Sequence, residues 1–171
     1  MTVTAVRKDP DNLRMTLDAE FDASPERVWQ LWADPRQLER WWGPPTYPAT
    51  FTKHDLSPGS RVEYHMTGPE GDQPKGYWDI LETEPPHRLV VRDGFANDDG
   101  TPNDDFPTGE MRVTIEQAGA GRTRMSIVSI FPSTEAMEQV LAMGQEQGMI
   151  EAMGQIDAIL AENAVGQPAG A

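Results

Sequence analysis

Cysteine is absent from this chain of 171 residues, which excludes a disulfide framework and thiolate chemistry. No hydrophobic run approaches the roughly 18 residues that a membrane-spanning helix requires. Residues 1–12 also lack the apolar core of a signal peptide. We therefore expect a cytoplasmic protein that does not insert into a membrane.

Basic and metal-binding residues are scarce as well. Lysine and arginine together number 14 against 28 aspartates and glutamates, and the net charge of −14 argues against nucleic acid or an anionic membrane as a partner. The three histidines, His54, His65 and His87, are not spaced as zinc ligands. The GxSxG, P-loop and dinucleotide-binding motifs are missing too, so the sequence predicts no metal and no cofactor.

What the chain does contain is a series of alternating segments. In Leu13–Phe21, every second residue is apolar and the residues between are polar, as in a strand with one buried face. Short turns separate most of the later segments, which favours an antiparallel meander. The predicted strands are Leu13–Phe21, Ala49–Asp55, Arg61–Thr67, Gly76–Glu82, Arg88–Asp93, Gly109–Glu116 and Thr123–Phe131.

Two short helices are expected between the first two strands. Ser24, followed by a proline, is a good N-cap for the first helix, which ends before Pro35. The second runs from Arg36 to Trp41. These segments carry a cluster of four tryptophans between Trp29 and Trp42. Such a cluster packs small helices against a larger element, and it is also suited to form the wall of an aromatic pocket.

The C-terminal region, Ser133 to Asn163, predicts one long helix. Apolar residues recur there at helical spacing, and a helix of about 30 residues would be about 45 Å long. Gly144, Gly148 and Gly154 lie inside it, and each costs roughly 0.8–1 kcal/mol relative to alanine. Either these glycines leave room for a ligand beneath the helix, or they allow close backbone packing or a kink.

The order of elements predicts an α+β fold in one domain. A curved sheet of seven antiparallel strands would hold the long helix across its concave face, and the two short helices would fill one open end. The expected domain spans residues 13–163. Residues 1–12 are expected to be flexible, and the small, polar tail 164–171 is expected to be disordered.

Charged residues offer candidates for chemistry without defining a site. The acidic run Asp98–Asp105 lacks the spacing and terminal glutamate of an EF-hand, so we interpret it as a solvated loop. Strand alternation turns Glu63, His65 and Asp79 away from the apolar face. Arg92 and Asp93 end a strand near the expected mouth of a cavity, where one of them faces inward or both form a surface ion pair.

Several segments resemble one known family. The run FDASPERVWQLWADPRQLERWWGP resembles the opening of the START-like, Bet v 1-like superfamily, also called SRPBCC or polyketide cyclase-like domains. The segments GYWDILETEPPHRLVV and TRMSIVSIFPSTEAM are similar to the branch that includes the C-terminal domain of the Hsp90 ATPase activator. The resemblance covers roughly Asp18 to Glu162, and Ser60 departs from the family's usual second glycine in one turn.

The resemblance implies the helix-grip fold with a cavity between the sheet and the final helix. Three functions stay open: binding of a small hydrophobic or aromatic metabolite, a cyclase or hydrolase reaction on a polyketide-like substrate, and a chaperone contact of the Hsp90 co-chaperone kind. The pattern is compatible with a monomer and with a dimer. The residues expected to contact a ligand are Trp41, Trp42, Tyr64, Met66, Trp78, Ile80, Phe95, Met111, Val113, Ile127, Met137, Leu141, Gly144 and Gly148.

Overall fold

The computed structural model describes residues 3–166 and contains one curved antiparallel sheet of eight strands. The strand order is β1-β2-β8-β7-β6-β5-β4-β3, so the N-terminal hairpin joins the end of the meander. The α+β class and the antiparallel sheet are as predicted. The strands are β1 Val3–Asp9, β2 Arg14–Phe21, β3 Ala49–Lys53, β4 Arg61–Met66, β5 Lys75–Glu84, β6 Arg88–Ala96, β7 Gly109–Gly119 and β8 Arg122–Ile130.

The eighth strand, β1, corrects the expectation of a flexible N-terminus. It pairs antiparallel with β2 along most of its length, and the two are joined by the short 3-10 helix Pro10–Asn12. Val3 and Val6 are half-buried against the core, and Arg7 forms an ion pair with Asp18 at 2.9 Å. Because β1 lies at the sheet edge and has no fully buried residue, its sequence lacks the clear alternation that marks β2.

The two short helices follow the prediction closely. They are α1 Pro25–Ala33 and α2 Pro35–Trp41. The Ser24 hydroxyl accepts a hydrogen bond from the Arg27 N–H at 3.1 Å, and the Asp34 carboxylate accepts one from the Arg36 N–H at 3.0 Å. Both helices therefore begin with a side-chain cap followed by proline, which fixes where they start.

The tryptophans of α1 and α2 fill one end of the space under the sheet. Trp32 and Trp41 are fully buried, with ring centroids 4.8 Å apart in an edge-to-face arrangement. Trp42 is 7% exposed and meets Trp78 of β5 at 5.0 Å. The Trp41 indole N–H donates to the Leu31 carbonyl at 3.0 Å. The expectation that at least one of Trp41 and Trp42 is buried is confirmed for both.

The C-terminal helical region is interrupted twice, where the sequence predicted one continuous helix. Its parts are α3 Thr134–Ala142, α4 Gln145–Met153 and α5 Ile156–Gly166. Gly144 has a φ of +88°, which ends α3 and redirects the chain into α4. A second break follows at Gly154. Residues 164–166 of the expected disordered tail belong to α5, and the remainder of that tail lies outside the described residues.

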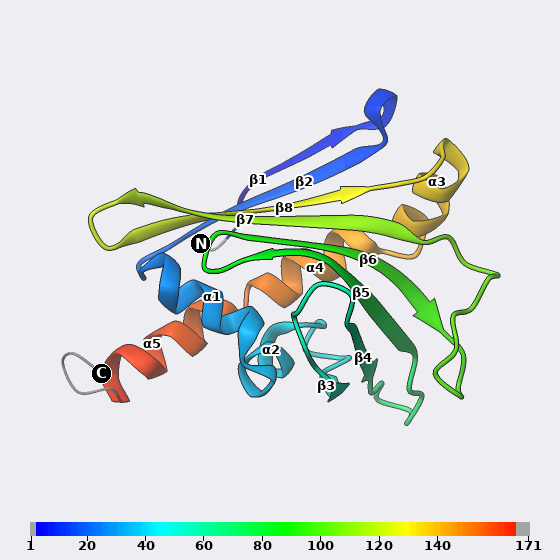
Figure 1. Ribbon diagram of the computed structural model, residues 1–171, viewed down its shortest axis with the longest axis horizontal. Coiled ribbons are helices and arrows are strands. Elements are labelled where there is room, and N and C mark those ends of the chain that lie inside the picture. Colours follow the sequence, from blue (N-terminus) through cyan, green and yellow to red (C-terminus); the bar gives the residue numbers. More distant parts are fainter. Residues whose placement is uncertain (1–2, 167–171) are drawn as a thin grey trace.

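Figure 1 shows the sheet as one layer and α1, α2, α4 and α5 as a second layer against its concave face. This is the helix-grip arrangement, with α4 crossing beneath the central strands. Within residues 3–166, no helix is long and apolar enough to span a bilayer. No group of three or more potential metal-ligating side chains occurs in that same part of the chain.

Candidate functional site

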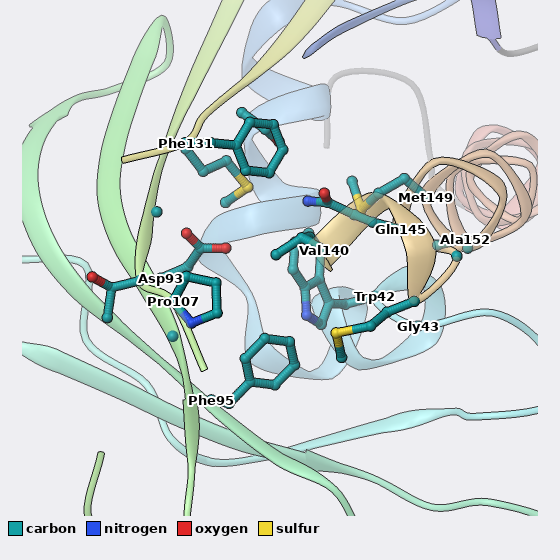
Figure 2. A pocket seen from close by; sticks show the side chains of 18 of the residues that line it. Trp42, Gly43, Asp93, Phe95, Pro107, Phe131, Val140, Gln145, Met149 and Ala152 are labelled. Atoms are coloured by element: carbon teal, nitrogen blue, oxygen red, sulfur yellow. The ribbon is translucent and has the colours of Figure 1, made fainter. Parts of the chain in front are cut away.

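A cavity of about 330 Å³ lies between the concave face of the sheet and the α3–α4 segment. Figure 2 shows its walls converging from β6, from the Phe131 segment after β8, from α4 and from the loop after α2. Most of its surface is apolar. Its principal side chains are Trp42, Tyr47, Tyr64, Met66, Asp93, Phe95, Pro107, Glu110, Met111, Ser129, Phe131, Val140, Met143, Gln145 and Met149.

Some of the residues predicted to line a cavity do so. Alternation along β4 places Tyr64 and Met66 on the cavity side, whereas their neighbours Glu63 and His65 do not line it. The predicted residues found in the wall are Trp42, Tyr64, Met66, Phe95, Met111, Gly144 and Gly148.

Other predicted residues belong to the solid core instead. Four of them lie on strands of the sheet where helices cover the concave face and leave no space, whereas Trp41 lies in α2, and Met137 and the half-buried Leu141 lie in α3. Trp41, Trp78, Val113 and Ile127 are fully buried. The predicted residues that do not line the cavity are Trp41, Trp78, Ile80, Val113, Ile127, Met137 and Leu141.

Several wall residues were not on the predicted list. Phe131 directly follows β8 and Val140 lies in α3, whereas Gln145 and Met149 lie in α4, whose direction depends on the bend at Gly144. Asp93 had a visible signal, since it stands between Val91 and Phe95 at alternate positions of β6. The strand extends to Ala96, so all three residues face the concave side, and Arg92 faces away.

Glycines shape the space on two walls. A Cβ added at Gly148 would meet no atom within 4 Å, so this position opens directly into free space beneath α4. On the sheet, the Tyr64 ring lies over Gly76, where an added Cβ would come within 2.5 Å of the Tyr64 hydroxyl. The glycine of β5 thus allows Tyr64 to lie flat along the wall.

Tyr64 is neutral in this environment. Burial raises the pKa of its phenol to about 12, and the nearby Asp93 carboxylate acts in the same direction. The indole groups of Trp42 and Trp78 oppose that rise. Tyr64 can therefore offer a hydroxyl to a bound molecule but not a phenolate near neutral pH.

Asp93 is the principal charged group of the cavity. Burial raises the pKa of its carboxyl to about 6, and a hydrogen bond from its own backbone N–H opposes the shift. Within residues 3–166, no basic side chain forms an ion pair with it. The side chain is half-buried and lines the cavity. Such a carboxyl changes charge near the pH of a cell.

The other acid–base candidates lie outside the cavity wall. Asp79 pairs with Arg61 at 2.7 Å, which is the structural role of a partly exposed ion pair. Gln145, by contrast, extends into the cavity, and its amide oxygen is buried without a hydrogen-bond donor among the described residues. Asp93 and Gln145 thus extend toward the same space from opposite walls (Figure 2).

A second hollow, of about 400 Å³, lies near His54 and is more open to solvent. It is lined by Trp29 and by the loops that carry Leu56, Pro58 and Pro85. The His54 ring nitrogen Nε2 is already 3.0 Å from the Trp32 carbonyl oxygen. The cavity beneath α4 is less open and has the larger apolar wall, so it has the stronger features of a binding site.

A family profile described as "Activator of Hsp90 ATPase homolog 1-like protein" matches residues 22–161. The chain belongs to this family. The resemblance to START-like, Bet v 1-like proteins is thereby confirmed, including its branch. Among curated proteins, none is similar to this chain.

Solved structures of related proteins share the whole fold. Protein Ms6760 from Mycobacterium smegmatis is 48% identical, with a TM-score of 0.85 and coverage of 92% of this chain and 96% of that one. A protein from Arthrobacter aurescens is 47% identical, with a TM-score of 0.90 and coverage of 98% and 94%. The AHSA1 protein from Silicibacter pomeroyi, at 21% identity, shows the likeness of fold alone, with a TM-score of 0.69 and coverage of 86% and 97%.

Proposed function

We propose that this protein binds a small hydrophobic or aromatic molecule in the cavity between the sheet and α4. The observation that carries the proposal is a partly open cavity of about 330 Å³ whose wall is mostly apolar. Aromatic faces come from Trp42, Phe95 and Phe131, and Met66 and Met149 add side chains that adapt to irregular shapes. Cavities of this size and composition suit small-molecule ligands.

The glycine at position 148 supports a ligand rather than a packing defect. Alanine at this site would favour the helix by up to about 1 kcal/mol, and it would meet no neighbour within 4 Å. Packing therefore does not require glycine here. The ligand-binding proposal explains the glycine, because a side chain at this position would take up space that a ligand needs.

Binding of a neutral fluorophore to the wild type and to a variant with a filled cavity tests this function. Phenylnaphthylamine should gain fluorescence in the wild type, and Gly148→Leu should abolish the gain because the leucine occupies the cavity. Ala158→Leu adds the same side chain to an exposed position of α5 and should bind like the wild type. Thermal melting should show both variants folded. Unchanged binding by a folded Gly148→Leu protein would overturn the proposal.

A second candidate is acid–base chemistry of the cyclase or hydrolase kind. Asp93 supports it, because a carboxyl with a pKa of about 6 inside an apolar cavity is suited to accept a proton near neutral pH. Deuterium exchange into the carbon next to the carbonyl of naphthylacetone would detect proton abstraction. The wild type should accelerate this exchange and Asp93→Asn should not. Equal exchange in both proteins would argue for binding alone.

Contact with a chaperone is the third candidate, and it rests on family membership. It needs an exposed surface rather than the cavity. A pulldown with purified Hsp90 separates it from the other two, because Gly148→Leu should leave such a contact unchanged while it blocks the cavity.

A further inference from the structure

The cavity wall contains acidic side chains but no basic ones. None of its lining residues is lysine, arginine or histidine, although acidic, aromatic and amide side chains are all present. Its titratable groups are Asp93 on β6, Glu110 on β7, Tyr64 on β4 and Tyr47 in the loop before β3. An anionic ligand would therefore find no opposite charge in this wall.

The two carboxylates differ in what they already contact. Glu110 accepts a hydrogen bond from the Arg112 guanidinium at 2.6 Å, so its charge is largely balanced by the protein. Asp93 has no such partner among the described side chains. An ionised carboxylate in an apolar enclosure without a counter-charge is unfavourable, and a ligand that supplies the charge would relieve that cost.

From this arrangement we propose that the cavity is built for an amphiphilic cation, an aromatic or aliphatic molecule whose protonated amine pairs with the Asp93 carboxylate. The proposal rests on the proposed binding function and names its ligand class. The apolar body of the ligand lies against Phe95, Phe131 and Met149, and the amine points toward β6.

The surroundings of Asp93 leave room for such a group. Gly109 is its partner on β7, and a Cβ there would come within 3.3 Å of the Asp93 Oδ1 atom. Glycine therefore keeps the neighbouring wall clear of the carboxylate. On the other side, the Gln145 amide extends toward the same space, and its oxygen is buried without a donor among the described residues (Figure 2). An ammonium group has three donors, and the Asp93 carboxylate offers two oxygens to accept them.

The aromatic faces of the cavity and the net charge of the chain both favour a cationic ligand. Trp42, Tyr64 and Phe95 line the cavity, and the faces of such rings attract cations. The chain also carries a net charge of −14, which raises the encounter rate with cations and lowers it with anions.

Three naphthyl compounds of similar size test the proposal by competition with phenylnaphthylamine. They are naphthylethylamine, a cation, naphthylethanol, which is neutral, and naphthylacetate, an anion. At about pH 7.5 the wild type should prefer the amine over the alcohol by at least about tenfold, the effect of one charged hydrogen bond. The acetate should bind more weakly than the alcohol.

Asp93→Asn should remove the preference for the amine over the alcohol. Glu116→Gln removes one negative charge from the exposed end of β7, outside the cavity, and should retain the preference. In the wild type, lowering the pH to about 5 should protonate Asp93 and reduce the preference without any mutation.

Each outcome separates this inference from the binding function. If phenylnaphthylamine binds but the amine and alcohol compete equally, the cationic ligand class is wrong and the binding function stands. If Asp93→Asn keeps the full preference for the amine, Asp93 is not the partner of the ligand. If none of the four compounds binds the folded wild type, both proposals fail.

Discussion

The two ends of the space beneath the sheet have been filled in opposite ways. Under α1 and α2, indole rings contact one another at centroid distances of 4.8 to 6.0 Å, and large side chains such as Trp32, Trp41 and Trp78 are fully buried. Under the α3–α4 segment, the same sheet faces a cavity of about 330 Å³, with glycine at position 148 and half-buried side chains around it.

Both ends contain some buried polar groups without a hydrogen-bond partner, since the Trp78 indole nitrogen also lacks one among the described residues, but the two ends differ in their charged groups. At the filled end, the Trp41 indole donates to the Leu31 carbonyl, and the Trp32 indole lies 3.3 Å from the Met125 sulfur. At the open end, the Asp93 carboxylate and the Gln145 amide oxygen lack side-chain partners in the described part of the chain. The difference that bears on the binding proposal is therefore one of packing, because only the end beneath α3–α4 leaves space next to its polar groups.

Trp41→Ala should give the largest loss of stability. Trp41 is fully buried and hydrogen-bonded, so its truncation should lower the free energy of unfolding by roughly 3–5 kcal/mol. Urea denaturation of the wild type and the variant measures this difference. A midpoint that barely moves would show that the tryptophan cluster is not the main stabilising contact.

Two phenylalanines allow the same substitution to be compared at both ends. Phe51 is 4% exposed and packs against Tyr64 at a centroid distance of 5.0 Å, whereas Phe95 is half-buried in the cavity wall. Phe51→Ala should cost roughly 3–5 kcal/mol, and Phe95→Ala less than about half of that. Equal losses would mean that the cavity wall is packed as tightly as the core.

Asp93→Asn should raise stability, in contrast to both truncations. The carboxyl has a pKa of about 6 in the folded protein and about 4 in an unfolded chain. Between about pH 4 and pH 6 the unfolded chain loses its proton first, so ionisation favours unfolding and wild-type stability falls as the pH rises. Above about pH 6 the ionised Asp93 lowers the free energy of unfolding of the wild type by its full amount, up to about 3 kcal/mol.

The measurement is the free energy of unfolding of both proteins over that pH range. The advantage of Asp93→Asn over the wild type should be small at about pH 4 and should grow until about pH 6. An advantage that is the same at every pH would show that burial does not shift the titration of Asp93.

The smallest effects concern two glycines of the C-terminal region and should have opposite signs. Gly144→Ala places a side chain at a φ of +88° and should cost about 1 kcal/mol. Gly148→Ala adds a methyl group to a helix where it meets no atom, and should gain up to about 1 kcal/mol. Thermal melting compares them. A loss at both positions would indicate that glycine serves packing in α4.

The fold was largely predictable because alternation and caps are local signals. Ser24, Asp34 and Ser133 cap the helices that follow them, and alternation identified the strands from β2 to β8. The edge strand β1 escaped because its residues are mostly exposed. The break at Gly144 was visible only as a glycine, and glycine alone does not reveal a positive φ.

Only part of the candidate site could be predicted from the sequence, and the reason is physical. Alternation tells which side chains face the concave side, and so it identified Tyr64, Met66 and Met111. It cannot tell whether a facing helix fills the space, and Ile127 and Trp78 face the same side within the solid core. That distinction depends on where the helices cross the sheet, which is set by contacts far apart in the chain.

Backbone amide chemical shifts, measured by NMR during titration with naphthylethylamine, test the central claim most directly. The account predicts saturable shifts that concentrate on β6 around Asp93 and Phe95 and on α4 around Gln145 and Met149, with the α1–α2 region little affected. Shifts that concentrate instead at Trp29, His54 and Thr83, the second hollow, or the absence of any saturable shift would contradict it.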